Sequence, residues 1–122
     1  MKLRIVVPPH PLISHWLTML RHPSTPSSLY STGLEQIGRW LTYEAVRDWL
    51  PIRNEIIETN NGKTEGKIIE SSVPVLGIPN LPAGLELWNG AKEILPNASL
   101  CLNGIPQVIG DKTGIIILED QI

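Results

Sequence analysis

Phenylalanine is absent from the sequence, and a single cysteine, Cys101, is present among its 122 residues. One cysteine excludes an internal disulfide, which fits a reducing compartment, and its place in an apolar run favours an inert buried thiol over a reactive one. No apolar run reaches the roughly 18 residues that a membrane-spanning helix needs. Prolines interrupt the N-terminal segment too early for a signal peptide. We therefore expect no transmembrane segment.

The sequence also lacks any block of like charges. Ten basic and twelve acidic residues give a formal net charge of -2, which indicates neither a nucleic-acid partner nor an anionic membrane surface. His10, His15 and His22 lie without the cysteine or carboxylate spacing of a metal site, and there is no nucleophile elbow, Walker loop or GxGxxG motif. These absences predict no catalytic residue of those classes, no metal site and no cofactor.

The length predicts one domain over residues 1–122, with an N-terminal arm and helices in residues 1–51. An apolar run is expected to form an edge strand or extended arm, and two stretches with apolar residues at helical spacing are expected to form a short and a long helix. Ser31 or Thr32 is the expected cap of the long helix, and Pro51 ends it. The apolar run is Leu3–Val7, the expected short helix is Leu12–Leu20, and the expected long helix is Gly33–Trp49.

Residues 54–70 have the pattern of a β-hairpin. Two strand-like runs flank Asn61-Gly62, the residue pair that a tight turn with positive φ prefers. Charged residues along both runs, such as Glu58 and Lys67, are typical of strands that face water. The sequence therefore predicts a hairpin with solvated faces.

Residues 73–122 are predicted to form a sheet and helix core. Val73–Ile78 is a mostly aliphatic run typical of a buried parallel strand, and Asn80–Gly84 turns the chain into an amphipathic helix that ends near Leu95. Two further apolar runs are expected to be buried strands, and Asn103-Gly104 and Gly110-Asp111 bound the loop between them. These two runs are Ala98–Leu102 and Gly114–Leu118.

Glu119-Asp120 directly follows the last apolar run, at the strand end where open α/β sheets bind ligands. Two adjacent carboxylates there can hold ribose hydroxyls or Mg²⁺. The alternative is that they are two solvated residues. The preceding turn, Pro79–Gly84, has no charged side chain and no glycine run to hold a phosphate.

Several of these segments resemble uracil phosphoribosyltransferase in its cyanobacterial and plastid form. The match begins at Val6-Val7-Pro8-Pro9-His10-Pro11-Leu12-Ile13, is closest at Gly38–Pro51, and continues through the hairpin to Leu85. The resemblance implies a doubly wound α/β fold that binds phosphoribosyl pyrophosphate and couples its ribose carbon to uracil. Glu119 and Asp120 would then belong to the start of the phosphoribosyl loop.

This sequence also departs from the family pattern at several positions. Pro82 stands where the family has an arginine, Gln107 stands at the position of a second arginine, and the segment from Ile105 to Lys112 is shortened. Each lost arginine would remove charge-assisted hydrogen bonds worth roughly 1.5–3 kcal/mol. In the family, the phosphoribosyl loop starts at the position of Glu119, and the uracil-recognition segment lies later still.

These observations together predict an α/β protein with an incomplete phosphoribosyltransferase-like fold: two N-terminal helices, a β-hairpin arm and a short parallel sheet of about three strands. Its expected role is a non-catalytic accessory subunit of a larger complex, or a homo-oligomer, in a photosynthetic organism. Its expected location is the cytoplasm or plastid stroma, with a peripheral place on a membrane-bound complex as a further option. The alternatives are a divergent or truncated uracil phosphoribosyltransferase and a weak nucleotide-binding regulatory module. Four tryptophans are candidate interface anchors, because tryptophan is enriched at binding hot spots: Trp16, Trp40, Trp49 and Trp88.

Overall fold

A computed structural model of the chain describes residues 5–102 and 114–118. Three helices, an antiparallel hairpin and a small parallel sheet make up the described part, as the sequence predicts. In chain order the elements are α1 (Pro11–Arg21), α2 (Ser27–Ala45), β1 (Ile52–Thr59), β2 (Gly62–Ile69), β3 (Val75–Pro79), α3 (Ala83–Ile94), β4 (Ser99–Leu100) and β5 (Gly114–Leu118).

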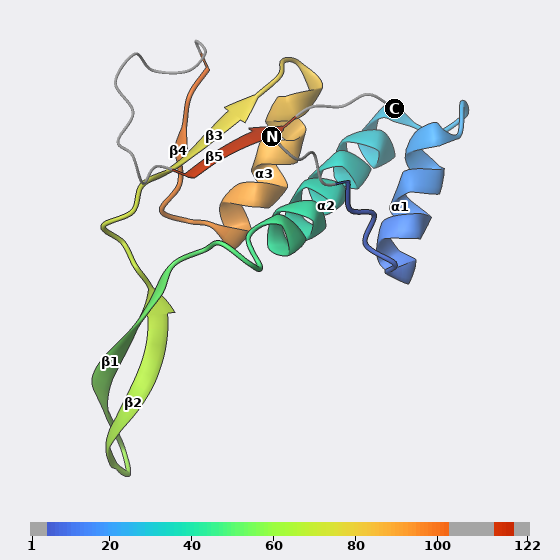
Figure 1. Ribbon diagram of the computed structural model, residues 1–122. Coiled ribbons are helices and arrows are strands. Elements are labelled where there is room, and N and C mark those ends of the chain that lie inside the picture. The colour runs from blue at the N-terminus through green and yellow to red at the C-terminus, as the bar shows by residue number, and fades with distance from the viewer. Residues whose placement is uncertain (1–4, 103–113, 119–122) are drawn as a thin grey trace.

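The helices and the sheet are stacked in layers, while the hairpin projects away from them (Figure 1). Helix α3 lies on one face of the sheet, α2 packs on α3, and α1 packs on the far side of α2. The core lies between these layers. Its buried residues are Ile13, Leu20, Leu34, Ile37, Leu87, Trp88, Ala91 and Leu118.

Helices α2 and α3 touch through their backbones at two glycines. A Cβ atom on Gly38 would lie 2.7 Å from the Cα of Leu87, and one on Gly90 would lie 2.7 Å from the amide nitrogen of Arg39. Because real Cβ atoms essentially never come so close to backbone, only glycine allows this approach. Arg39 bridges the same two helices through an ion pair with Glu93.

The predicted bounds of α2 are wrong at both ends. The helix begins at Ser27, and Pro26 rather than Ser31 or Thr32 is its N-cap. No side chain caps it, and the Pro26 carbonyl accepts the Tyr30 N–H at 2.9 Å, so a backbone bond begins the helix where the sequence pattern suggests a loop. At the other end the helix stops at Ala45, and residues 46–49 form a turn.

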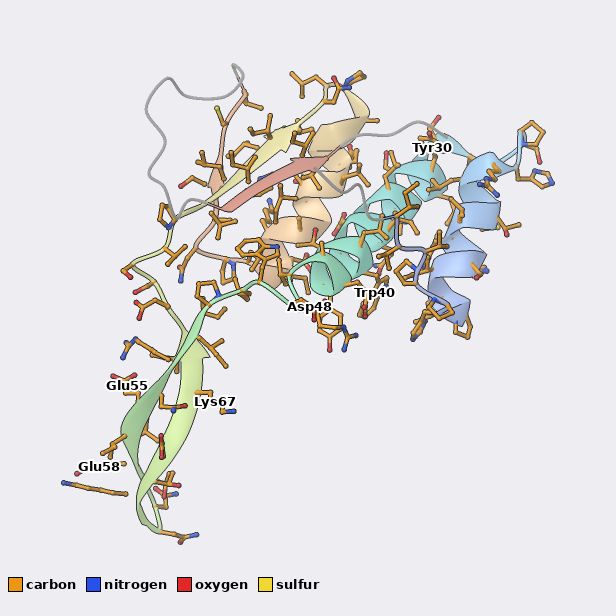
Figure 2. All side chains as sticks on the ribbon, viewed as in Figure 1. Tyr30, Trp40, Asp48, Glu55, Glu58 and Lys67 are labelled. Atoms are coloured by element: carbon orange, nitrogen blue, oxygen red, sulfur yellow. The ribbon has the colours of Figure 1, made fainter. Side chains whose placement is uncertain are left out.

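The hairpin forms as predicted. Strands β1 and β2 pair in antiparallel register from Ile52↔Ile69 to Thr59↔Gly62, and Gly62 has a φ of 111°. Glu55, Glu58 and Lys67 project from the strands (Figure 2). Four isoleucines are also exposed, although the sequence pattern suggests mostly charged faces: Ile52, Ile56, Ile57 and Ile69.

The parallel sheet has the strand order β4-β3-β5. The prediction that its outer strands are buried is wrong in part. Strand β4 is two residues long and exposed, and in β5 Ile115 and Ile117 are exposed while Leu118 is buried. The physical reason is that, among the described elements, helix packing covers only one face of the sheet.

Two smaller predictions concern the chain's apolar runs. Residues 5–7 are exposed and form no strand, which fits the extended-arm alternative for this part of the N-terminal run, while residues 3 and 4 lie outside the described residues. Cys101 is half-buried rather than buried, and its N–H donates to the Gly77 carbonyl at 2.9 Å. The predicted turns at Asn103-Gly104 and Gly110-Asp111 lie outside the described residues. Within the described ranges, no helix is both long and apolar enough to cross a membrane.

Candidate functional site

The carboxyl ends of β3 and β5 meet at one edge of the sheet. Pro79 is in register with Leu118, and the Asn80 N–H donates to the Leu118 carbonyl at 2.7 Å. This bond fixes the end of β5 beside the turn that leaves β3. Glu119 and Asp120, the predicted ligand carboxylates, follow Leu118 directly in the sequence but lie outside the described residues.

Gly84 brings the first turn of α3 against both strand ends. A Cβ atom at this position would lie 2.5 Å from the Leu118 carbonyl oxygen and 3.0 Å from the Pro79 Cα. The Gly84 N–H also donates to the Asn80 carbonyl at 2.9 Å. Only glycine at position 84 therefore lets the start of α3 lie this close to both the end of β3 and the end of β5.

The first turn of α3 already uses part of its capacity to bind anions. Helix N-termini attract phosphates through backbone N–H groups that have no intrahelical partner. Here the Gly84 N–H bonds to Asn80, and the Leu85 N–H bonds to the Pro82 carbonyl at 3.2 Å. The N-cap is Pro82, one residue earlier than the first-turn position that the sequence suggests, and it offers neither charge nor donor.

Arg39 makes three side-chain contacts within the helical layer. Its guanidinium donates to Gln36 Oε1 at 3.1 Å, pairs with Glu93, and lies 3.9 Å from Glu35. These contacts join α2 to α3, so the guanidinium is committed to helix packing. Sequence reasoning did not single out this residue, because its main partner is 54 positions away.

The three histidines have structural contacts. His10 Nδ1 accepts the Leu12 N–H at 3.1 Å and so caps α1, and its ring stacks on Trp40 with centroids 6.4 Å apart. His22 Nδ1 lies 2.8 Å from Ser24 Oγ, and His15 packs edge-on against Trp16. Residues 5–102 and 114–118 contain no group of three His, Cys, Asp or Glu side chains able to hold a metal.

The four tryptophans differ in exposure. Trp88 is 8% exposed and packs over Gly77, where a Cβ atom would lie 2.6 Å from Cε3 of its ring. Trp16 and Trp40 are half-buried against the core, and Trp49 is 40% exposed. Trp49 therefore has the largest free surface of the four, and an interface role for these residues stays a prediction.

A groove lies where α2 ends, away from the strand ends. This groove, of about 590 Å³, is partly apolar, and its basic side chain, Arg47, is engaged by Glu44, with Nη2 and Oε1 2.7 Å apart. The hydrogen bond and charge of Glu44 raise the pKa of Arg47 above its ordinary value, so the guanidinium stays protonated. The lining residues are Val6, Pro8, Leu41, Glu44, Ala45, Arg47, Asp48 and Trp49.

Comparison with known proteins identifies the protein family to which the chain belongs. The family model for uracil phosphoribosyltransferase matches residues 7–113, and the chain therefore belongs to that family. The AQ2163 protein from Aquifex aeolicus has a similar structure, with a TM-score of 0.70 and 30% identity over 80% of this chain and 46% of that one. The resemblance inferred from the sequence, and with it the phosphoribosyltransferase-like fold, is confirmed.

Particular relatives come from cyanobacteria and plants. The uracil phosphoribosyltransferase of a Nostoc species is 38% identical over 99% of this chain and 63% of its own length. That of Synechococcus elongatus is 43% identical over 81% of this chain and 46% of its own, and the chloroplastic protein of Arabidopsis thaliana is 38% identical over 78% and 32%. The chain thus spans less than two thirds of the length of these relatives.

These relatives overturn the expected role as a non-catalytic subunit of a larger complex. They are named as uracil phosphoribosyltransferases, and the similarity extends across almost the whole chain. That prediction gave too much weight to Pro82 and Gln107. A substitution at two positions affects only the contacts of those side chains, whereas the family match extends over residues 7–113.

Proposed function

We propose that this chain acts in uracil phosphoribosyl transfer, in which a ring nitrogen of uracil bonds to the ribose carbon of phosphoribosyl pyrophosphate and pyrophosphate leaves. The observation that supports this proposal is the family match over residues 7–113. The relatives named for this activity add support, because their similarity includes both the helical layer and the strand ends.

The carboxyl edge of β3 and β5 is the part of the structure to which we assign the phosphoribosyl group. Open α/β sheets bind ligands at such an edge, and the Asn80–Leu118 bond holds the two strand ends together there. We propose that Glu119 and Asp120, which follow Leu118 in the sequence, bind the ribose hydroxyls. The first turn of α3 offers a phosphate fewer free donors than an ordinary helix start, since the Gly84 and Leu85 N–H groups already donate within the turn.

The nucleotide-binding regulatory module is a weaker alternative. It places the ligand at the start of α3, where two N–H groups are engaged and the described turn from Asn80 to Gly84 has no charged side chain. For location we propose the cytoplasm of a cyanobacterium or the stroma of a plastid, because the relatives named above are cyanobacterial or plant proteins and one is called chloroplastic.

Calorimetric titration of phosphoribosyl pyrophosphate with Mg²⁺ into the purified chain tests the proposed site. We expect saturable binding in the millimolar range, weakened at least tenfold by the double change Glu119→Gln and Asp120→Asn. The pair Glu58→Gln and Glu65→Gln, on the exposed hairpin, is the matched control and should leave the affinity unchanged. An absence of heat at millimolar ligand, or equal loss in both double variants, would contradict the assignment.

A further inference from the structure

The sequence contains three Asn-Gly pairs, and the fold places two of them in opposite surroundings. Asn61-Gly62 closes the hairpin, Asn89-Gly90 lies within α3, and Asn103-Gly104 lies outside the described residues. Asparagine is among the thermolabile residues. It is most labile before glycine, because the glycine nitrogen can attack the preceding side-chain amide without hindrance from a side chain of its own. In a folded protein this reaction depends on exposure and on the freedom of the backbone.

The pair Asn61-Gly62 is open to water. It lies at the tip of the hairpin, which projects away from the helices and the parallel sheet (Figure 1). Both residues are exposed, and a Cβ atom at Gly62 would meet nothing within 4 Å. The Asn61 side-chain amide makes no hydrogen bond with any described residue. Water and hydroxide therefore reach the amide that would react.

The turn at this tip is only weakly restrained. The Thr59 hydroxyl accepts the Asn61 N–H at 3.2 Å and donates to the Gly62 carbonyl at 2.8 Å. Both bonds are exposed, so water competes for the same groups. Glycine at position 62 also has more backbone freedom than any other residue would have there. The main chain on either side of the reacting bond can therefore rotate into the geometry that ring closure needs.

The helical pair has neither property. Asn89 is half-buried, and its Nδ2 lies 3.5 Å from Glu86 Oε2. Gly90 is buried against the Glu35 carbonyl of α2. Within a helix the Gly90 N–H bonds to the carbonyl four residues earlier, so its nitrogen is not free to attack. Ring closure at this pair would disrupt both α3 and its packing on α2.

We propose that Asn61 is a site of spontaneous deamidation, and that the fold directs this modification to the hairpin while it protects Asn89. The Gly62 nitrogen loses its proton to hydroxide and attacks Asn61 Cγ. A C–N bond forms, the Cγ–Nδ2 bond breaks, and the amide leaves as ammonia after taking a proton from water. Water then opens the succinimide ring. Opening at Cγ yields aspartate, and opening at the Asn61 main-chain carbonyl yields isoaspartate.

This modification changes the hairpin in two ways. Either product adds one negative charge at the tip. Isoaspartate also routes the main chain through the side-chain CH₂ group, which lengthens the connection between Thr59 and Gly62, the last pair of the β1–β2 register. Because loop length fixes the register of a hairpin, we expect strand pairing near the tip to loosen. The inference does not depend on the proposed function, since Asn61 lies outside the candidate site.

Ageing the full 122-residue chain in mildly alkaline buffer tests the proposal. Trypsin cleaves after Lys63, so Asn61 and Asn89 fall in different peptides, and mass spectrometry measures the replacement of each amide by a carboxyl group. We expect Asn61 to react at least tenfold faster than Asn89 in the folded chain. In the chain unfolded in guanidinium chloride, the two should react at similar rates, because the fold no longer protects Asn89.

Two controls separate the chemistry of the pair from the exposure of the turn. Asn60 is equally exposed in the same turn but precedes asparagine rather than glycine, so it should react at least tenfold more slowly than Asn61. Fragment ions distinguish the two positions within one peptide. Asn61→Gln keeps the amide but would need a larger ring, and it should show no deamidation over the same time.

Three results would overturn the proposal: an Asn61 that reacts no faster than Asn89 or Asn60 in the folded chain, the same excess of Asn61 over Asn89 in the unfolded chain, or a product that is aspartate alone. The second would show that the fold does not direct the modification. The third would exclude the succinimide, whose opening also yields isoaspartate. An isoaspartate-specific carboxyl methyltransferase applied to the tryptic peptides makes that last measurement.

Discussion

Gly90 of α3 lies directly against the Glu35 carbonyl of α2, so that any Cβ atom at position 90 would overlap this oxygen. Gly38 makes the reciprocal contact with the Leu87 backbone. This pair of glycines sets the separation of the two helices, and α3 in turn covers the sheet whose strand ends form the candidate site. The position of the site therefore depends on the contact between α2 and α3, although α2 contributes no residue to it.

Gly90→Ala is expected to destabilise the fold by about 1–3 kcal/mol, the usual cost of forcing extra volume into a packed interior. The neighbouring atoms are backbone atoms, which have little freedom to move aside. Gly66→Ala is the control, since a Cβ atom there would meet its nearest neighbour, Ile57 Cδ1, at 3.6 Å. Urea unfolding of both variants makes the measurement. Equal stability of the two would contradict the close helix contact.

Thr42→Val is expected to leave the unfolding free energy unchanged or to raise it by up to about 1–2 kcal/mol. Thr42 is 2% exposed, and its hydroxyl has no hydrogen-bond partner among the described residues. An unpaired buried hydroxyl costs roughly 1–3 kcal/mol, and valine keeps the shape while removing that cost. Thermal unfolding followed by circular dichroism gives the answer. A large loss of stability would mean that the hydroxyl has a partner in solution.

Replacing a buried tryptophan with alanine is expected to destabilise the fold more than replacing an exposed one. Trp88→Ala is expected to cost about 3–5 kcal/mol, because it empties a buried site above Gly77. Trp49→Ala should cost less than half as much, since Trp49 is 40% exposed. Chemical denaturation ranks the two, and the reverse order would show that Trp49 is covered in the native protein.

Glu70 is expected to make the free energy of unfolding depend on pH. The Ser72 N–H donates to Glu70 Oε1 at 3.1 Å and, with the Ser72 hydroxyl and Arg53, holds the Glu70 pKa below its ordinary value of 4.5. A carboxyl group whose pKa is lowered by folding stabilises the native state at any pH above its pKa in the unfolded chain. This stabilisation is lost as the pH falls through its pKa in the folded protein. Unfolding measured between about pH 6 and pH 3 should show a decline below pH 4.5 that is smaller in Glu70→Gln. An identical decline in both proteins would contradict this role.

Local patterns were sufficient for much of the fold. Asn61-Gly62 predicts the hairpin because glycine readily adopts the positive φ that Gly62 has beside the turn, and the apolar spacing after Gly84 predicts α3. The start of α2 was missed because a backbone bond to Pro26 replaces the expected side-chain cap. Burial of β5 was overestimated, since an aliphatic run does not reveal whether helices cover one face of a sheet or both.

The candidate site was predictable only in part. The sequence indicates the strand end at Leu118 and the turn after Pro79, because both are local features. It does not indicate that Gly84 touches the Leu118 carbonyl, since that contact joins residues far apart in the chain. Nor does it reveal that the first N–H groups of α3 are already engaged, which depends on the exact path of the turn from Asn80 to Leu85.

The central claim is that this chain acts in uracil phosphoribosyl transfer. Its most direct test is to purify the protein containing this sequence from its native cells and to measure the conversion of labelled uracil to uridine monophosphate with phosphoribosyl pyrophosphate and Mg²⁺. The account predicts product that requires both substrates, together with one pyrophosphate per nucleotide. A folded protein that forms no product at millimolar phosphoribosyl pyrophosphate would contradict it.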